Sequence, residues 1–474
     1  MPRDPHMAKI SHIAFVLFFV LVSIPAATRA EEPIKITIDP QSTTATISED
    51  FLGLGYETSA VAQADYFTDK NHTLVQLYRN LSHQGLIRIG GNISDHTRFE
   101  PDGIAKVNPE ERVTIINEVS LRNLAGFARA TGWKVMWGLN LGTGSKEQAV
   151  QEAVAVDQEL GPNLQSFEIG NEVDLMRRYA RDFDAYHAAY TEYKAAIRAK
   201  LPRAVFSGPD VAGNLSFVEK FVGSEAGDMK LATHHYYRGG ASSPRATLQT
   251  LLARDDGFDR RLDALHALCA DHHLEYRINE VNSFSGGGKP GVSDTFGSAL
   301  WCLDYMFDLA SHGCSGVNME TDINQHAFIS HYSPIVHDAN GHCTARPEYY
   351  AMLSFAMAGH GYLTKTAMSK SDVNCTAYST QSSDSIWVTV IDKDFTKDAQ
   401  VELELPSQSG AVKIYRLIAP SIEAKDHVTL AGSSVADDGT WTPGEPEVVP
   451  ISQGHIQFAV AHASAILIKL ARPQ

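Results

Sequence analysis

Cysteine is scarce in this chain. Only five of the 474 residues are cysteines, and none forms a Cys-x-x-Cys pair or a ligand cluster with histidine. Zinc and redox motifs depend on such spacing, so the sequence predicts no metal, nucleotide or redox cofactor. An odd count leaves at least one thiol free, and we expect most of the five to be buried. The five are Cys269, Cys302, Cys314, Cys343 and Cys375.

Positive charge is also in short supply. The chain has 40 lysines and arginines against 56 aspartates and glutamates, a formal net charge of -16. Long-range repulsion from an acidic surface argues against nucleic acid or a polyanionic sulfated chain as the main partner. A small anion can still bind beside a local cation. No oligomeric state follows from the composition.

Long apolar runs are absent, with one exception. Residues 10–24 are almost wholly apolar, follow a basic start and lead into Pro-Ala-Ala-Thr-Arg-Ala at 25–30. This pattern predicts a secretory signal peptide over residues 1–30, cleaved after Ala30. The alternative is an uncleaved anchor helix, although the run is shorter than the roughly 20 residues that a bilayer span needs. We therefore expect a secreted or periplasmic protein that does not contact the membrane after cleavage.

The main feature that is present is an alternation of short apolar strands with longer helical segments, which indicates parallel βα units. Segments 120–131, 146–160 and 182–201 have apolar residues at helical spacing. Eight strands are predicted, and eight close a TIM barrel. The predicted strands cover residues 51–56, 86–89, 134–141, 166–169, 204–207, 231–235, 275–278 and 316–319. The fold class is therefore α/β, with a (β/α)8 TIM barrel over residues 51–360.

The last part of the chain, residues 361–474, has a different pattern. Short alternating segments are separated there by Ser, Asp, Gly and Pro clusters, which is typical of a β-sandwich. Near the other end, residues 34–38 and 43–47 also alternate and need sheet partners. We expect these N-terminal strands, within residues 31–50, to join the C-terminal β-sandwich. The strands predicted in the C-terminal part are 375–379, 385–392, 399–405, 411–417, 427–430 and 455–470.

Two glutamates come at the ends of two predicted barrel strands. The run Phe-Glu-Ile-Gly-Asn-Glu ends at Glu172 after the fourth strand, and Glu-Tyr-Arg-Ile-Asn-Glu ends at Glu280 after the seventh. Side chains at strand ends share the open face of a barrel. Two carboxylates in that setting are what glycoside hydrolysis needs, one as acid and one as nucleophile. A single glutamate here could equally form a salt bridge, but two at strands four and seven favour catalysis.

Glu168 is the competitor to Glu172. It lies four positions earlier on the same strand, so its side chain points to the same side but deeper in the barrel. We interpret it as the structural partner of a buried arginine such as Arg88.

Several motifs, in chain order, resemble glycoside hydrolase family 79, whose members are β-glucuronidases and heparanases of the retaining clan A barrels. The resemblance covers residues 51–361, and the two-domain layout is similar too. The motifs that carry it are Leu-Ile-Arg-Ile-Gly-Gly at 86–91, Phe-Glu-Ile-Gly-Asn-Glu at 167–172, Ser-Gly-Pro-Asp-Val at 207–211, His-His-Tyr-Tyr at 234–237, Ser-Phe-Ser-Gly-Gly-Gly-Lys at 283–289 and Val-Ser-Asp-Thr-Phe at 292–296.

The resemblance implies a role for individual residues. Glu172 corresponds to the general acid/base and Glu280 to the nucleophile. Asn171 would hold the sugar 2-hydroxyl, and Tyr236 would hydrogen-bond the nucleophile.

In the family, backbone amides of a glycine run and a tyrosine on the loop after the eighth strand hold the uronate carboxylate, and Gly286, Gly287 and Tyr332 correspond to those positions. Successive glycine N–H groups can form a concave anion site, and Lys289 adds a positive charge; the alternative is a flexible solvent loop. One position departs from the family, because Ser285 stands where a tyrosine is usual.

Glu57 and Asp95, after the first and second strands, are further candidate ligands of sugar hydroxyls, with solvated surface acids as the alternative. The leading hypothesis is a retaining, exo-acting β-glucuronidase that acts on glucuronide-containing saccharides or conjugates. Alternatives are an endo-β-glucuronidase of heparanase type, a neutral-sugar glycosidase of clan A and, from another class, a catalytically silent carbohydrate-binding protein.

Overall fold

The computed structural model describes residues 32–108, 110–111, 113–321, 323, 330–338, 340–405 and 409–472. The predicted signal peptide lies outside these residues. Among the helices that are described, none is long and apolar enough to cross a bilayer.

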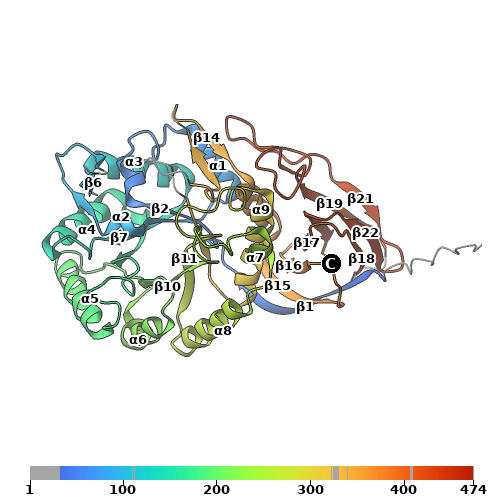
Figure 1. Ribbon diagram of the computed structural model, residues 1–474, viewed down its shortest axis with the longest axis horizontal. Helices are drawn as coiled ribbons and strands as arrows, with labels where there is room; N and C mark the ends of the chain where they lie inside the picture. Colours follow the sequence, from blue (N-terminus) through green and yellow to red (C-terminus); the bar gives the residue numbers. More distant parts are fainter. Residues whose placement is uncertain are drawn as a thin grey trace, which may run out of the picture. The chain divides into compact units, whose positions relative to one another are not determined.

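A barrel of eight parallel strands forms one half of the structure (Figure 1). Its strand order is β8-β7-β3-β2-β12-β11-β10-β9, and every neighbouring pair is parallel. A parallel bridge between Phe167 and Phe206 joins the two ends of this order and closes the barrel. The strands are β2 (Leu52–Glu57), β3 (Leu86–Gly90), β7 (Lys134–Leu139), β8 (Leu164–Ile169), β9 (Gly208–Val211), β10 (Leu231–Tyr237), β11 (Glu275–Asn282) and β12 (Val317–Glu320).

The predicted TIM barrel is confirmed, and one strand is displaced from its predicted place. The fifth strand was expected at 204–207 but β9 begins at Gly208. Gly-Pro-Asp is a turn signature in most sequences, which hid a strand that is buried throughout. Phe206 still takes part in closing the barrel through its bridge to Phe167.

Amphipathic helices follow the barrel strands, and their ends carry recognisable caps. Asn117 and Ser120 form a capping box at the start of α3, and Gly132, with φ 82°, ends that helix. Ser145 and Gln148 form the same arrangement on α4. The main helices are α1 (His72–Leu81), α3 (Glu118–Thr131), α4 (Lys146–Leu160), α5 (Phe183–Arg198), α6 (Leu215–Glu225), α8 (Asp256–Asp271), α9 (Phe296–Ser311) and α10 (Pro347–Ala358).

Shorter elements lie in the loops around the barrel. They are α2 (Gly91–Ser94), α7 (Leu248–Leu252), the 3-10 turns η1 (Thr58–Ala62), η2 (Gly161–Asn163) and η3 (Ala226–Asp228), a small sheet of β4 (Thr97–Phe99), β5 (Lys106–Asn108) and β6 (Val113–Ile116), and the hairpin β13 (Ile335–His337) with β14 (Cys343–Ala345).

The second half is a β-sandwich made from one continuous ten-stranded sheet. Its order is β20-β19-β23-β17-β16-β15-β1-β18-β22, with β21 paired to β19. The strands are β1 (Ile34–Ile47), β15 (Gly361–Met368), β16 (Cys375–Gln381), β17 (Ser385–Asp392), β18 (Ala399–Glu404), β19 (Ala411–Ile418), β20 (Thr429–Leu430), β21 (Glu447–Pro450), β22 (His455–Val460) and β23 (Ser464–Ala471).

The N-terminal strand lies inside this sheet, as the sequence predicted. β1 pairs with β15 on one side and with β18 on the other, so a segment from the start of the chain separates two C-terminal strands (Figure 1). It is one strand of 14 residues, where two were predicted. Register shifts between Asp39 and Ala45 mark the place where the sequence suggested a break.

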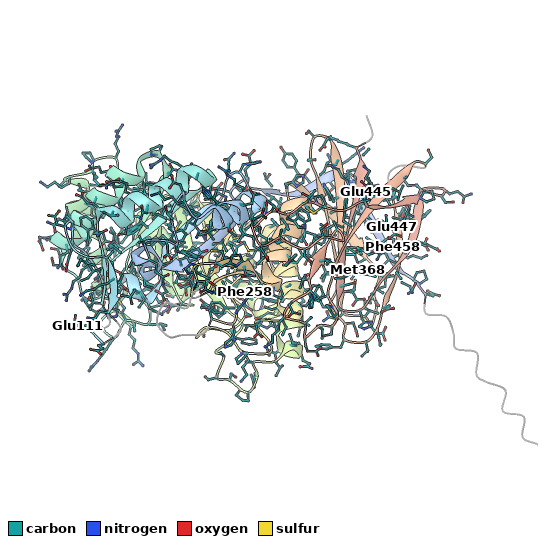
Figure 2. All side chains as sticks on the ribbon, turned by 90° about the horizontal axis from the view of Figure 1, so that it is seen from above. Glu111, Phe258, Met368, Glu445, Glu447 and Phe458 are labelled. Carbon is teal, nitrogen blue, oxygen red and sulfur yellow. The ribbon has the colours of Figure 1, made fainter. Side chains whose placement is uncertain are left out.

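The sheet folds over on itself to enclose a separate apolar core. Val388 of β17 and Ile468 of β23 pack with Val401 of β18 and Ile456 of β22, which lie at the other end of the strand order. Glu447 and Phe458 lie on this half of the structure, and Phe258 lies on the barrel half (Figure 2). The predicted strand 455–470 is broken into β22 and β23 around Ala463, which has φ 49°.

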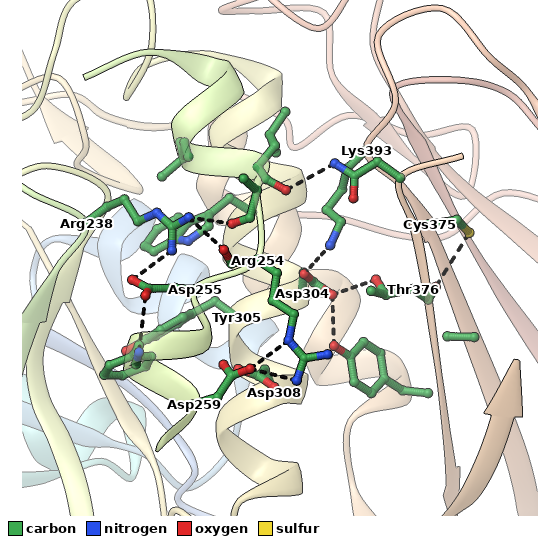
Figure 3. Close-up of a pocket in the computed structure, with 18 of the residues that line it drawn as sticks. Arg238, Arg254, Asp255, Asp259, Asp304, Tyr305, Asp308, Cys375, Thr376 and Lys393 are labelled. Carbon is green, nitrogen blue, oxygen red and sulfur yellow. Dashed lines mark hydrogen bonds and ion pairs between the residues drawn. The ribbon is translucent and has the colours of Figure 1, made fainter. Parts of the chain in front are cut away.

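The barrel and the sandwich share an apolar interface through α9 and α10. Phe307 of α9 stacks on Tyr378 of β16 with ring centroids 5.0 Å apart. A cavity of about 490 Å³ also lies between the two halves, and most of its charged groups are paired with one another, for example Lys393 with Asp304 (Figure 3). All five cysteines are free, and all are buried, as was expected for most of them.

Candidate active site

Glu172 lies in a tight turn directly after β8. Gly170 has φ 84° and Glu172 has φ 45°, a backbone conformation that side-chain-bearing residues rarely adopt. The N–H of Glu172 donates to the carbonyl oxygen of Asp210 at 2.7 Å, which holds the turn. The Glu172 side chain is 17% exposed, so its carboxylate reaches the open face of the barrel.

Glu280 lies within β11, two residues before the strand ends. The pairing of β10 with β11 shifts register at this point: His234 is opposite Ile278, and His235 is opposite Glu280. The extra residue is Asn279, and the bulge lets two consecutive side chains contact the interior of the barrel. Asn279 donates to Glu168, and Glu280 accepts from Arg88.

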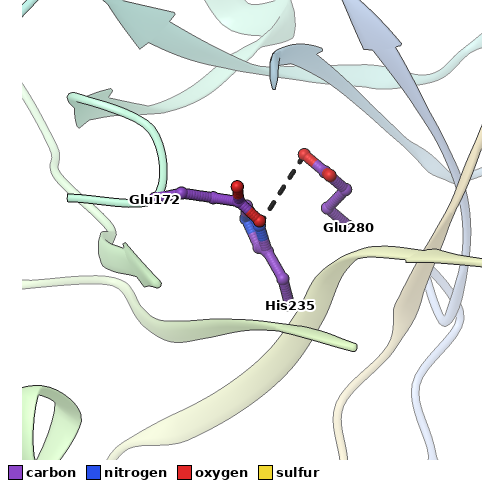
Figure 4. Close-up of side chains that lie close together, drawn as sticks. All are labelled: Glu172, His235 and Glu280. Atoms are coloured by element: carbon purple, nitrogen blue, oxygen red, sulfur yellow. Dashed lines mark hydrogen bonds and ion pairs between the residues drawn. The ribbon is translucent and has the colours of Figure 1, made fainter. Parts of the chain in front are cut away.

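The structure brings the two glutamates together. One carboxylate oxygen of Glu172, one of Glu280 and a ring nitrogen of His235 all lie within 4.8 Å of one another (Figure 4). Retaining glycosidases keep their two carboxyl groups about 5–5.5 Å apart, and inverting ones roughly 6.5–9.5 Å. The spacing fits the retaining arrangement.

Arg88 of β3 holds the floor of the site and is fully buried. Its Nη1 donates to Glu280 Oε2 at 2.7 Å, and its Nη2 donates to Asp210 Oδ2 at 2.7 Å and to Asn171 Oδ1 at 2.6 Å. Glu168 is 3.5 Å from Nε, so the predicted pairing of Arg88 with Glu168 is present but is the longest of these contacts.

The protonation states of this buried group balance its charge. Burial raises the pKa of Glu168 to about 8, helped by the nearby Asp210. Burial would also raise the pKa of Asp210, but Arg88 and His235 hold it below its ordinary value. Arg88 and His235 therefore both lie against the carboxyl groups of Asp210 and Glu280.

His235 of β10 stands between the two glutamates. Its Nδ1 is 3.2 Å from Glu172 Oε1 and 3.7 Å from Glu280 Oε2, and its Nε2 is 2.6 Å from Asp210 Oδ1. Burial would lower the pKa of His235, but Glu280 and Asp210 raise it well above the ordinary value.

The tyrosine that contacts Glu280 is Tyr237, and the prediction of Tyr236 was wrong. The Tyr237 hydroxyl donates to Glu280 Oε1 at 2.9 Å. Tyr236 points to the other side of β10, donates to Asp255 at 2.7 Å and stacks on Phe258. It lines the cavity between barrel and sandwich. Successive side chains alternate along a strand, so Tyr237 shares its side with His235.

The carboxylates of Asp95 and Glu57 accept hydrogen bonds from backbone N–H groups, although both were predicted to bind sugar hydroxyls. Asp95 Oδ1 accepts from the N–H groups of Leu141 and Gly142, and its Oδ2 accepts from that of Asn171 at 3.1 Å. Burial nevertheless raises the pKa of Asp95 to about 6. Glu57 Oε2 accepts from the N–H of Ile93 at 2.7 Å, in α2. Both carboxylates therefore position loops around Asn171 and Glu172.

The glycine-rich loop follows β11, the strand that carries Glu280. Gly286 and Gly287 both have φ 80°, and within the described part of the chain no atom comes within 4 Å of the place a Cβ would take on Gly286. The N–H of His331 donates to the carbonyl of Gly287 at 2.7 Å, which ties this loop to the segment of Tyr332. The Tyr332 ring centroid is 6.3 Å from that of Tyr237.

Lys289 and Ser285, at the two ends of this loop, make different hydrogen bonds. Lys289 is half-buried and donates its backbone N–H to Ser293 at 2.8 Å. Ser285, which replaces the family's tyrosine, contacts the backbone of Gly239 through its own N–H at 2.8 Å and its hydroxyl at 3.4 Å.

Beside Glu172 lies a second hollow of about 450 Å³. It is lined by residues of three loops, including Asn92, Thr143, Leu175 and Arg177, and Leu175 is 65% exposed. The hollow extends the site away from Glu280.

His235, Tyr237 and Asp210 were not singled out as functional residues from the sequence. His-His-Tyr-Tyr at 234–237 has equally polar and aromatic residues on both faces of the strand, so the sequence does not say which pair faces inward. Asp210 stood in an apparent turn. A signal was nevertheless present: an inward-facing Glu172 and a buried Arg88 both need polar partners, and residues such as His235 and Asp210 could have been proposed as those partners.

Comparisons with known proteins bear on the fold and the class of enzyme. Residues 356–467 match the family model described as the glycosyl hydrolase family 79 C-terminal beta domain. A β-glucuronidase of Aspergillus niger is 25% identical over 81% of this chain and 83% of its own length. A β-glucuronidase of Neurospora crassa is 33% identical over 21% of this chain and 19% of its own length.

Solved structures show the same fold. A 4-O-α-L-rhamnosyl-β-D-glucuronidase from Fusarium oxysporum superposes with a TM-score of 0.74 at 18% identity, covering 92% of this chain and all of that one. An α-L-arabinofuranosidase from Thermotoga maritima gives 0.70 at 14% identity, covering 93% of this chain and all of that one. The matched C-terminal domain, residues 356–467, is that of glycosyl hydrolase family 79, and together with the relative that aligns over most of the chain these findings indicate a glycosidase.

Proposed function

We propose that this protein is a retaining, exo-acting β-glucuronidase that releases glucuronic acid from glucuronides by double displacement. The observation that carries the proposal is the approach of the Glu172 and Glu280 carboxylate oxygens to within 4.8 Å. That spacing leaves room for one anomeric carbon between them and too little for the extra water of an inverting enzyme.

Each residue of the site then has a chemical role. Glu280 attacks the anomeric carbon, oriented by Tyr237 at 2.9 Å and Arg88 at 2.7 Å. Glu172 protonates the departing oxygen and afterwards removes a proton from water. Asn171, fixed through its Oδ1 by Arg88, keeps its amide N–H₂ for Asn92 and for the sugar 2-hydroxyl.

The uronate carboxylate would bind at the glycine-rich loop. The backbone conformation of Gly286 and Gly287 favours a concave donor site, Lys289 supplies a cation, and Tyr332 adds a hydroxyl nearby. Both sequence relatives are named β-glucuronidases, and the Fusarium enzyme acts on a rhamnosylated glucuronide. The replacement by Ser285 removes one family contact, so the preference over neutral sugars rests on the remaining groups.

The first prediction concerns the sugar. Aryl β-glucuronide should be hydrolysed with a kcat/KM about tenfold or more above that for the aryl β-glucoside, because a charge-assisted bond contributes roughly 1.5–3 kcal/mol. Glu280→Gln should lower kcat by about 10⁴-fold, since it removes the nucleophile. Glu275→Gln, at the exposed start of the same strand, serves as the matched control and should keep full activity.

Other outcomes point to other activities. Faster turnover of the glucoside or an arabinofuranoside would contradict the uronate preference. Cleavage of a glucuronate-containing polymer without release from the aryl glucuronide would favour endo action. Binding of the sugar without turnover of any glycoside would indicate a silent binding protein.

The second prediction concerns Lys289. Lys289→Ala should raise KM for the aryl glucuronide about tenfold and leave the glucoside unchanged, because about 1.4 kcal/mol of charge-assisted binding is lost. Lys220→Ala, on the exposed surface of α6, controls for the loss of one positive charge. Equal effects of Lys289→Ala on both sugars would show that Lys289 does not bind the uronate carboxylate.

We also propose that the protein acts outside the cytoplasm, on the strength of the apolar segment at residues 10–24. The full chain expressed in a secretion-competent host should appear in the medium or periplasm with Glu31 as its first residue, which N-terminal sequencing would report. Retention of the intact N-terminus in a membrane fraction would favour the anchor alternative.

A further inference from the structure

His235 is a side chain of the site that is fixed on both ring nitrogens. It is completely buried in β10, with Asp210 Oδ1 2.6 Å from Nε2. Asp210 is itself held by Arg88 at 2.7 Å and by Asn279. These contacts fix the orientation and the position of the ring, so its Nδ1 stays directed at the gap between Glu172 and Glu280.

We propose that His235 is a positioning residue that serves as the shared hydrogen-bond donor and counter-charge of Glu172 and Glu280, acting on each carboxylate in the step in which that carboxylate is charged. This inference rests on the proposed double-displacement function. It goes beyond it by assigning a role to a side chain that touches neither sugar nor leaving group.

The argument follows the charge through the reaction. In the first step a Glu280 oxygen forms a bond to the anomeric carbon, the bond to the leaving oxygen breaks with its electron pair, and that oxygen takes the proton of Glu172. Glu280 becomes a neutral ester and Glu172 a carboxylate. The pair carries one negative charge before and after, but the charge has moved from one glutamate to the other.

The second step reverses this movement. Water gives a proton to Glu172 while its oxygen bonds to the anomeric carbon, and the ester bond breaks to restore the Glu280 carboxylate. A cation placed between the two glutamates is useful in both states without moving. His235 Nδ1 has that position, 3.2 Å from Glu172 Oε1 and 3.7 Å from Glu280 Oε2 (Figure 4).

The other charged groups around the ring support a protonated imidazole. Asp210 faces it from β9, Glu172 from the turn after β8 and Glu280 from β11. Arg88 is the opposing cation, but its contacts are to the carboxylates on either side of the ring. Because Asp210 and Glu280 outweigh burial, the pKa of His235 lies well above its usual range.

The adjacent His234 provides an unusual internal control. It is equally buried, at 1% exposure, on the same strand, but it points to the other side. Neither of its ring nitrogens has a hydrogen-bond partner among the residues that the structure describes, and burial lowers its pKa to about 3. A change at His234 therefore tests the effect of altering a buried histidine of β10 without touching the glutamates.

The test compares His235→Asn with His234→Asn on two substrates, a dinitrophenyl β-glucuronide whose leaving group needs no proton and an alkyl β-glucuronide whose leaving group does. His235→Asn should lower kcat/KM for the alkyl substrate by about 10²–10³-fold, the scale of acid–base assistance, and affect the dinitrophenyl substrate at least tenfold less. The pH profile should also shift upward, because a carboxylate that loses a positive neighbour keeps its proton to a higher pH. His234→Asn should keep the wild-type leaving-group dependence and pH profile.

Equal losses on both substrates with an unchanged pH profile would overturn the proposal and leave His235 a structural residue. Activity within about threefold of wild type would overturn it too. If wild type hydrolyses another aryl glycoside in preference to glucuronides, the proposed sugar is wrong, and the same two leaving groups on that sugar decide the role of His235.

A measurement on the unmodified chain covers the case in which His235→Asn does not fold. With ¹⁵N-labelled histidine, both ring nitrogens of His235 should be protonated in the free enzyme and in the covalent enzyme trapped with a 2-fluoro sugar. The His235 signals are those of a buried ring that respond to trapping. A neutral ring in either state would contradict the shared counter-charge.

Discussion

The site depends on one buried cation. Arg88 is fully enclosed by the barrel and reaches side chains supplied by β8, β9, β11 and the turn after β8. A buried guanidinium is stable only if its donors are met, and removal of a partner from such a pair costs about 3–5 kcal/mol. The same contacts that satisfy Arg88 orient Glu280 and Asn171. Barrel stability and catalytic geometry are thus consequences of a single arrangement.

The rest of the fold supplies the frame for this group. Strand closure through Phe167 and Phe206 brings β8 beside β9, so that the Glu172 turn can bond to Asp210. The sandwich does not contribute a residue to the described site; it packs on α9 and α10, the helices that follow β11 and β12 in the chain. The N-terminal strand β1 fastens the start of the chain into that sandwich between β15 and β18.

The sequence predicted the features that depend on local pattern. Strand and helix periodicity gave the barrel, and strand-end chemistry gave Glu172 and Glu280. The sequence did not predict which way a side chain points where that direction depends on a neighbouring strand. Tyr236 and Tyr237 are both aromatic, and only the strand's place in the barrel tells which one faces Glu280. Asp95 looked like a free acid because its three backbone donors come from loops after two other strands, which no local pattern reveals.

The central claim is that two carboxylates share one anomeric carbon at the spacing of a double displacement. Proton NMR of the first sugar released from a β-glucuronide tests it most directly. The β-anomer should appear first and then mutarotate, and a 2-fluoro glucuronide should leave its sugar covalently attached to Glu280 in peptide mass spectra. Initial release of the α-anomer, with no adduct on Glu280, would contradict the account.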